Sequence, residues 1–147
     1  MQLDDMAKFL LAVHVLAAIL LVGPVAVAAS LFPRFATPSG GGGHDVAALL
    51  HRICRSYAAV GVVVPVFGIA TAARLGVLTD AWLVVSVVLT AAAAAVLGLR
   101  ILPAQRRLLT TPAKGASGLM TATGVFNLIW AVVVVLMILR PGSTTGA

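Results

Sequence analysis

Four runs of about 20 apolar residues dominate this chain and decide what it can fold into. A helix of about 20 residues crosses the roughly 30 Å hydrocarbon core of a bilayer. Because every backbone amide inside lipid needs an internal partner, each run is expected to be a helix in spite of its many valines. The runs cover residues 9–31, 57–75, 81–102 and 119–139.

The composition excludes an ordinary soluble domain. Of the 147 residues, 61% are hydrophobic and 10% are charged, whereas soluble domains average about 45–50% apolar and about 25% charged residues. We therefore predict an all-α membrane protein, a single membrane domain built as a bundle of four transmembrane helices. The predicted helices cover residues 9–31, 46–75, 81–102 and 118–139, with a glycine-rich loop at 38–43 and a polar tail at 141–147.

The basic residues predict how the chain is oriented in the membrane. The formal net charge is +6, and most of the cations adjoin the first and third loops: Arg34, Arg52, Arg55, Arg100, Arg106, Arg107 and Lys114. The positive-inside rule then places loops 32–45 and 103–117 in the cytoplasm and both termini on the outer side. This pattern indicates a multi-pass membrane protein. No Lys/Arg stripe alternates with aromatic residues, so nucleic acid is not an expected partner.

An amphipathic segment precedes the second apolar run. Val46, Leu50 and Ile53 recur at helical spacing, and Asp45 is a suitable N-cap residue for a helix that starts beside it. Two interpretations of the basic residues at this end remain open: they meet the phosphates of anionic lipids, or they dock a protein partner. The residues concerned are Arg52, Arg55, Arg106 and Arg107.

His14 is the strongly ionisable side chain that lies well inside an apolar run. Such residues are costly in lipid and are candidates for function. One interpretation is a neutral histidine that hydrogen-bonds a neighbouring helix. The other is a ligand for haem or copper. His44 and His51 belong to the opposite side of the membrane and cannot share a metal with it, which leaves Met137 as a weak candidate for a second ligand.

The chain offers no other catalytic chemistry that we recognise. It has no glutamate, and its four aspartates lie outside the apolar runs, at positions 4, 5, 45 and 80. Its one cysteine, Cys54, cannot form an internal disulfide or a structural zinc site by itself. The glycine run 40–43 lacks the Lys-Ser/Thr that completes a phosphate-binding loop.

Small and polar residues predict how the helices pack. Small side chains let membrane helices approach closely, and amides can bridge them. The residues expected to pack helices together are Gly61, Gly68, Gly98, Gly124 and Asn127. Pro24 and Pro65 are expected to kink the first two helices, and Pro103 is expected to end the third.

Several short motifs resemble those of small bacterial four-helix membrane proteins. The segment from Phe9 to Gly23, with His14 followed by an apolar run, resembles their first helix. Leu102-Pro103-Ala104-Gln105-Arg106-Arg107 and Leu136-Met137-Ile138-Leu139-Arg140-Pro141 resemble the ends of helices three and four in an uncharacterised family of predicted integral membrane proteins. That family is related to the copper-resistance D proteins and the HemJ-type protoporphyrinogen oxidases. The resemblance implies a four-helix fold in a bacterial plasma membrane.

This chain differs from the patterns of the copper-resistance D and HemJ-type proteins at positions that bear on activity. Their first helix usually carries a Trp before the Gly, where this chain has Leu20-Leu21-Val22, although Phe32-Pro33-Arg34 resembles a HemJ-type segment. The HemJ type also implies a lysine in helix three, and the lysines here are Lys8 and Lys114. Only His14 carries over from the pattern, without its expected partner.

We expect a non-catalytic accessory or stabilising subunit of a larger bacterial membrane complex, a respiratory-chain assembly being the leading example. Its expected partners are other membrane protein subunits and anionic lipids, with no cofactor. One alternative is a haem- or copper-binding redox protein that uses His14, and another is a small transporter component. The lack of carboxylates inside the apolar runs counts against the transporter.

Overall fold

The computed structural model describes residues 3–38, 42–111 and 116–143, and this part of the chain forms helices and no strand. Residues 39–41 of the glycine-rich loop, Lys114 and residues 144–147 of the tail lie outside the described residues. The helical segments are α1 (Leu3–Ala17), η1 (Ala18–Val22), α2 (Gly23–Phe35), α3 (Gly43–Val60), α4 (Val63–Leu75), α5 (Ala81–Val96), η2 (Leu97–Ile101), α6 (Leu102–Thr110) and α7 (Ser117–Leu139).

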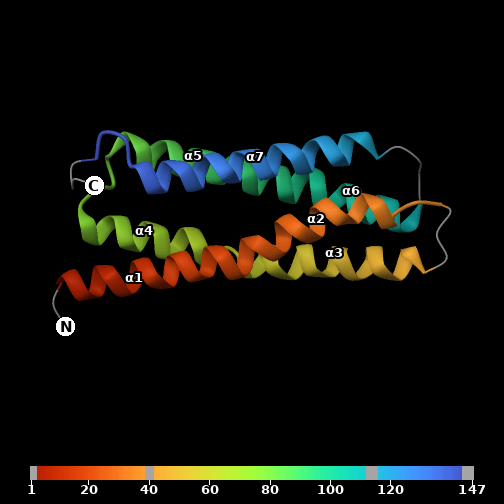
Figure 1. Ribbon diagram of the computed structural model, residues 1–147, viewed down its shortest axis with the longest axis horizontal. Coiled ribbons are helices and arrows are strands. Elements are labelled where there is room, and N and C mark those ends of the chain that lie inside the picture. Colours follow the sequence, from red (N-terminus) through yellow and green to blue (C-terminus); the bar gives the residue numbers. More distant parts are fainter. Residues whose placement is uncertain (1–2, 39–41, 112–115, 144–147) are drawn as a thin grey trace.

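These segments join into four spans that run back and forth (Figure 1). Each is long and apolar enough to cross a membrane: Asp5–Phe35, Gly43–Leu75, Ala81–Thr110 and Ser117–Leu139. The start of α1, the end of α7 and the α4–α5 connection share one end of the bundle, here called the terminal end. The α2–α3 and α6–α7 connections share the other, here called the basic end. The chain is thus an all-helical bundle of the multi-pass membrane type.

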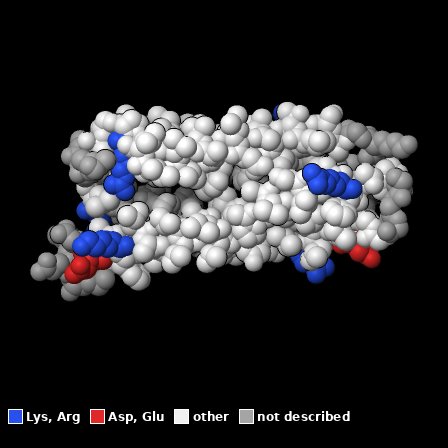
Figure 2. Space-filling view, viewed as in Figure 1, with Lys and Arg blue, Asp and Glu red and all other residues white. Residues whose placement is uncertain are grey.

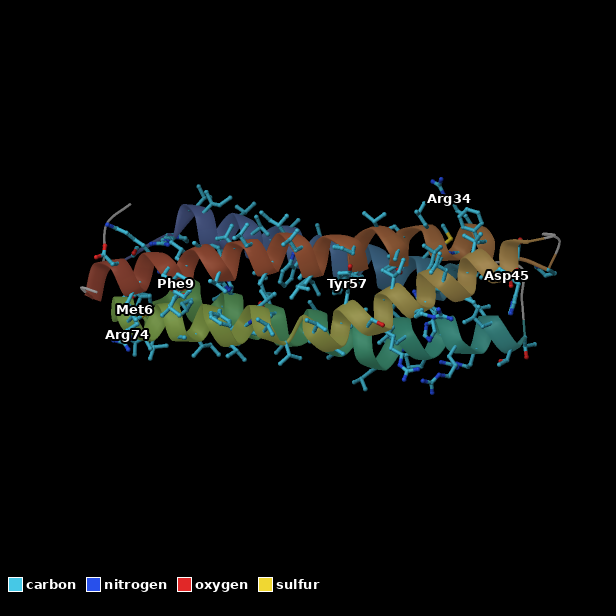
Figure 3. The ribbon with its side chains drawn as sticks, turned by 90° about the horizontal axis from the view of Figure 1, so that it is seen from below. Met6, Phe9, Arg34, Asp45, Tyr57 and Arg74 are labelled. Carbon is cyan, nitrogen blue, oxygen red and sulfur yellow. The ribbon has the colours of Figure 1, made fainter. Side chains whose placement is uncertain are left out.

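The charged side chains agree with this arrangement. On the face drawn in Figure 2 they lie toward the two ends, and the middle of the bundle carries none. Figure 3 places Met6, Phe9 and Arg74 at the terminal end and Arg34 and Asp45 at the basic end. A belt without charge is what the hydrocarbon core of a bilayer requires.

All four spans extend beyond the predicted limits, the fourth by the single residue Ser117. The first covers residues 3–35 instead of 9–31, the second begins at Gly43 instead of residue 46, and the third continues to Thr110 instead of ending at 102. Asp45 accordingly lies inside the first turn of α3 and is not its N-cap, which is Gly42. A carboxylate in the first turn still favours the helix through the helix dipole.

The helix continues past Pro103 because a π-helical turn precedes it. Proline lacks an N–H, and its ring clashes with the carbonyl four residues earlier in a regular helix. In η2 the backbone widens to hydrogen bonds between residues five apart, and the N–H of Leu102 donates to the carbonyl of Leu97. The same solution recurs in the first span, where η1 comes directly before Gly23 and Pro24. Both prolines therefore lie within continuous spans.

The second span instead breaks before its proline. α3 ends at Val60 and α4 begins at Val63, two residues before Pro65. At the break Gly61 N–H donates to the carbonyl of Tyr57 at 2.7 Å, and Val64 N–H donates to that of Gly61 at 3.0 Å. The first bond is the last α-helical one of α3, and the second closes a shorter turn of three residues, so the backbone stays bonded across the break.

The bundle has two layers that meet mainly toward the basic end. α1 packs along α4 and α5 along α7, while α2 packs on both α3 and α7, and α3 on α6. The main core lies in this half and includes Ala29, Phe32, Cys54, Ile101 and Phe126. A smaller cluster of Ala72, Val77, Trp82 and Leu83 closes the terminal end.

Candidate functional site

His14 faces α4 from α1. Its Nδ1 lies 2.7 Å from the carbonyl oxygen of Val64. Because a carbonyl oxygen only accepts, Nδ1 carries the proton and donates it. The bond joins the two helices of one layer inside the apolar part of the bundle.

Gly68 provides the space that the His14 ring occupies. A Cβ added at Gly68 would lie 2.8 Å from Cε1 and 3.0 Å from Nδ1 of His14. Only a residue without a side chain lets the imidazole rest on the backbone of α4 at this distance. The structure therefore brings together two residues that the sequence analysis singled out for different reasons, and adds the Val64 carbonyl, which carries no sequence signal.

The chemistry open to His14 follows from this tautomer. With the proton on Nδ1, the neutral ring keeps a lone pair on Nε2, for which the described residues supply no hydrogen-bond partner. Histidine ligands of metals are commonly oriented by such a bond to a backbone carbonyl. However, the described part of the chain contains no group of three His, Cys, Asp or Glu residues placed to hold a metal ion. Met137 packs against the cluster at the terminal end.

Asn127 ties the two layers together. Its Nδ2 donates to the Oγ of Ser30 at 3.1 Å, which links α7 to α2. The Ser30 hydroxyl in turn donates to the carbonyl of Ala26 at 2.7 Å. Asn127 Oδ1 and the nearby Thr123 Oγ1 are buried without a hydrogen-bond partner.

The other three glycines do not pack helices together inside the bundle as we expected. The nearest neighbours of a Cβ at Gly61 are carbonyls of its own helix, Tyr57 and Ala58, so this glycine serves the break between α3 and α4. At Gly98 and Gly124 an added Cβ meets nothing within 4 Å. Both glycines face away from the bundle because the inward faces of their helices are occupied by larger residues such as Ile101 and Phe126.

A buried polar network at the basic end was not predicted. Gln105 is 0% exposed, and its Oε1 accepts from Nδ1 of His51 at 2.9 Å. Its Nε2 lies 3.6 Å from Sγ of Cys54, which is buried beside the carbonyl of Val25. The network connects α6, α3 and α2. The signal for it is periodicity, since position 105 falls on the same helical face as Ile101 and Leu108.

A second polar contact fixes the terminal end. The indole N–H of Trp82 donates to Oδ2 of Asp80 at 3.1 Å, and the guanidinium of Arg140 lies 5.5 Å from the centre of the Trp82 ring. Asp80 precedes α5, but no side-chain capping bond forms there. Such a cation–π contact contributes about 0.5–2 kcal/mol.

The predicted basic residues lie on the outside of the basic end. Arg52, Arg55, Arg106 and Arg107 are all exposed, and none has an ion-pair partner among the described residues. Their positive charges are therefore available to a membrane surface or a partner.

All four spans line a half-open pocket of about 130 Å³. It lies beside the break in the second span, and its wall includes Tyr57, Pro65, Thr90, Phe126 and Trp130. His14 is not part of this wall. The pocket is largely apolar, and the polar side chains in its wall are those of Tyr57, Thr90 and Trp130.

No protein-family model, curated protein or solved structure matches this chain.

Proposed function

We propose that this chain is a non-catalytic accessory subunit that stabilises a larger bacterial membrane complex, with a respiratory-chain assembly as the expected host. The observation that carries the proposal is a stripe of small residues on the outer face of the third span, formed by Ala91, Ala95 and Gly98. All three are exposed, whereas Ala93 on the opposite face of α5 is buried in the core.

Small residues have a specific use in membrane helices. They let a second helix come close enough for dispersion contacts and weak hydrogen bonds to hold the pair. In this bundle the stripe is not used for internal packing, because a Cβ at Gly98 meets nothing within 4 Å. The stripe therefore fits a helix of another subunit.

The environment of His14 also favours a structural role. Its Nδ1 proton is committed to the carbonyl of Val64, and its ring is seated against Gly68. A histidine used in this way holds α1 on α4.

The proposed orientation keeps the basic end in the cytoplasm and both termini outside. Labelling with an impermeant maleimide of a cysteine introduced at Ser143 in intact cells tests this orientation.

Enlarging the stripe is expected to release the partner without unfolding the subunit. The Ala91→Leu/Ala95→Leu variant should reduce recovery of partner subunits in a mild-detergent pull-down by at least ten-fold, because the bulky side chains block close helix approach. Ala59→Leu adds the same side chain to an exposed position of the second span and serves as the control. Equal recovery with the stripe variant and the control would show that the stripe is not an interface.

A second candidate function is a haem- or copper-binding redox protein. The observation that favours it is the free Nε2 of His14, oriented by the Nδ1 bond. The same purified protein tests it: a Soret absorption band or stoichiometric copper that disappears in His14→Ala would support the redox role. We expect neither, and we expect His14→Ala to remain in the complex.

A further inference from the structure

A groove of about 550 Å³ separates the third and fourth spans at the basic end. From the third span it is lined by residues at helical spacing, which therefore share one face: Val96, Arg100, Ala104, Arg107 and Leu108. The first turns of α7 form the other wall, from Ala116 to Val125.

The floor of the groove is apolar and shallowly walled, because its alanine and glycine residues are small and carry no polar side-chain atom. Ala104 on one side faces Gly118 and Ala122 on the other, and a Cβ at Gly118 meets nothing within 4 Å. From Gly118 to Val125 the groove follows eight residues of α7, about 12 Å along the helix axis. It therefore runs from the end of the fourth span toward the interior of the membrane.

The charged residues of the groove are both arginines. Arg100 and Arg107 are seven residues apart on this face, about 10 Å along the helix axis. Both are exposed, and neither has a carboxylate partner among the described residues. Asp45, the acidic side chain described at this end, lies on α3. Guanidinium groups bind phosphate oxygens through paired N–H donors.

We propose that this groove binds one anionic phospholipid, with its phosphate held by Arg100 and Arg107 and an acyl chain lying on the floor formed by Ala104, Gly118 and Ala122. The occupant must be anionic at one end and apolar along its length, since the groove pairs unpartnered cations with an apolar channel at the edge of the membrane. A free phosphate ion would use the arginines and leave the floor empty. The site does not depend on the accessory-subunit proposal.

Native mass spectrometry of the purified protein, with phosphatidylglycerol or phosphatidylcholine added, tests the site. The wild-type protein should retain one phosphatidylglycerol in preference to phosphatidylcholine. Arg100→Gln/Arg107→Gln should lower this retention by at least about ten-fold, because two charge-assisted contacts are lost. The control Arg52→Gln/Arg106→Gln removes the same charge from the same end but leaves the groove intact, and should change retention less than two-fold. Equal loss in both variants would overturn the proposal in favour of diffuse attraction to the basic end.

A variant of the floor separates a lipid from a headgroup. Gly118→Phe keeps both arginines and fills the channel, and it should also lower retention of phosphatidylglycerol by about ten-fold or more. Inorganic phosphate at about 10 mM should not displace the lipid, because it gains nothing from the floor. Full retention by Gly118→Phe, or displacement by phosphate, would overturn the proposal. Thermal unfolding of each variant, followed by circular dichroism, confirms that the comparison is between folded proteins.

Discussion

Gly68→Ala is expected to destabilise the wild-type chain and to stabilise the His14→Ala variant. In the wild type the new methyl group would lie 2.8 Å from Cε1 of His14, so the ring must leave its place and give up the bond to Val64. Leaving the part-buried His14 donor without its acceptor costs about 1–3 kcal/mol, against the roughly 1 kcal/mol that alanine gains over glycine in a helix. In the His14→Ala variant the ring is absent, so Gly68→Ala only adds the helix-stabilising effect of alanine over glycine.

The double-mutant cycle is measured by unfolding in mixed micelles with increasing SDS. Reactivity of Cys54 toward a maleimide reports unfolding, since this single cysteine is 0% exposed in the folded chain. We expect a coupling energy of about 2 kcal/mol between the two positions. If Gly68→Ala has the same effect in both backgrounds, the imidazole does not rest on Gly68, and the structural role assigned to His14 fails.

Gln105→Leu is expected to loosen the basic end by about 2–3 kcal/mol. The substitution keeps a similar volume but removes the acceptor for Nδ1 of His51 and the donor to Cys54. The half-buried His51 is then left with an unsatisfied donor, at a cost of about 1–3 kcal/mol.

Arg106→Gln is the matched control for this substitution. Arg106 is the next residue along α6 but is exposed, so its replacement should change stability by less than about 0.5 kcal/mol. Cys54→Ala should cost less than Gln105→Leu, because the thiol is only a weak donor and acceptor in its contacts with Gln105 and the Val25 carbonyl. Equal stability of Gln105→Leu and Arg106→Gln would show that the network does not hold α6 on α3. The SDS titration with circular dichroism reports all three variants, including the one that lacks the thiol.

Hydropathy alone predicts the four spans because the lipid requirement for internal backbone bonding is so strong. The ends of the spans were harder to predict, and Pro103 shows why. A proline ordinarily ends a helix, but the π turn of η2 allows the third span to continue to Thr110. No residue in Leu97–Ile101 signals that turn. The second span likewise begins earlier than predicted, at Gly43 instead of Val46, because glycine is a poor helix former and does not indicate a helix start.

The sites depend on how the helices are rotated against one another, and the sequence pattern alone does not reveal this rotation. His14 and Gly68 are 54 positions apart and meet only because α1 lies along α4 in one register. Gly98 and Gly124 have the same composition signal as Gly68, yet they face outward. Gln105 had a usable signal in its position on an apolar face, but its neighbours Arg106 and Arg107 made the segment resemble a solvated one.

The size of the assembly in which this chain resides tests the accessory-subunit proposal most directly. Host membranes extracted in digitonin are separated on a native gel, and the proteins in each slice are identified by mass spectrometry. The proposal predicts that the 14.9 kDa chain migrates with the subunits of a much larger complex, in constant ratio to them. Migration alone or as a homodimer, with no enzyme subunits in the same slices, would contradict it.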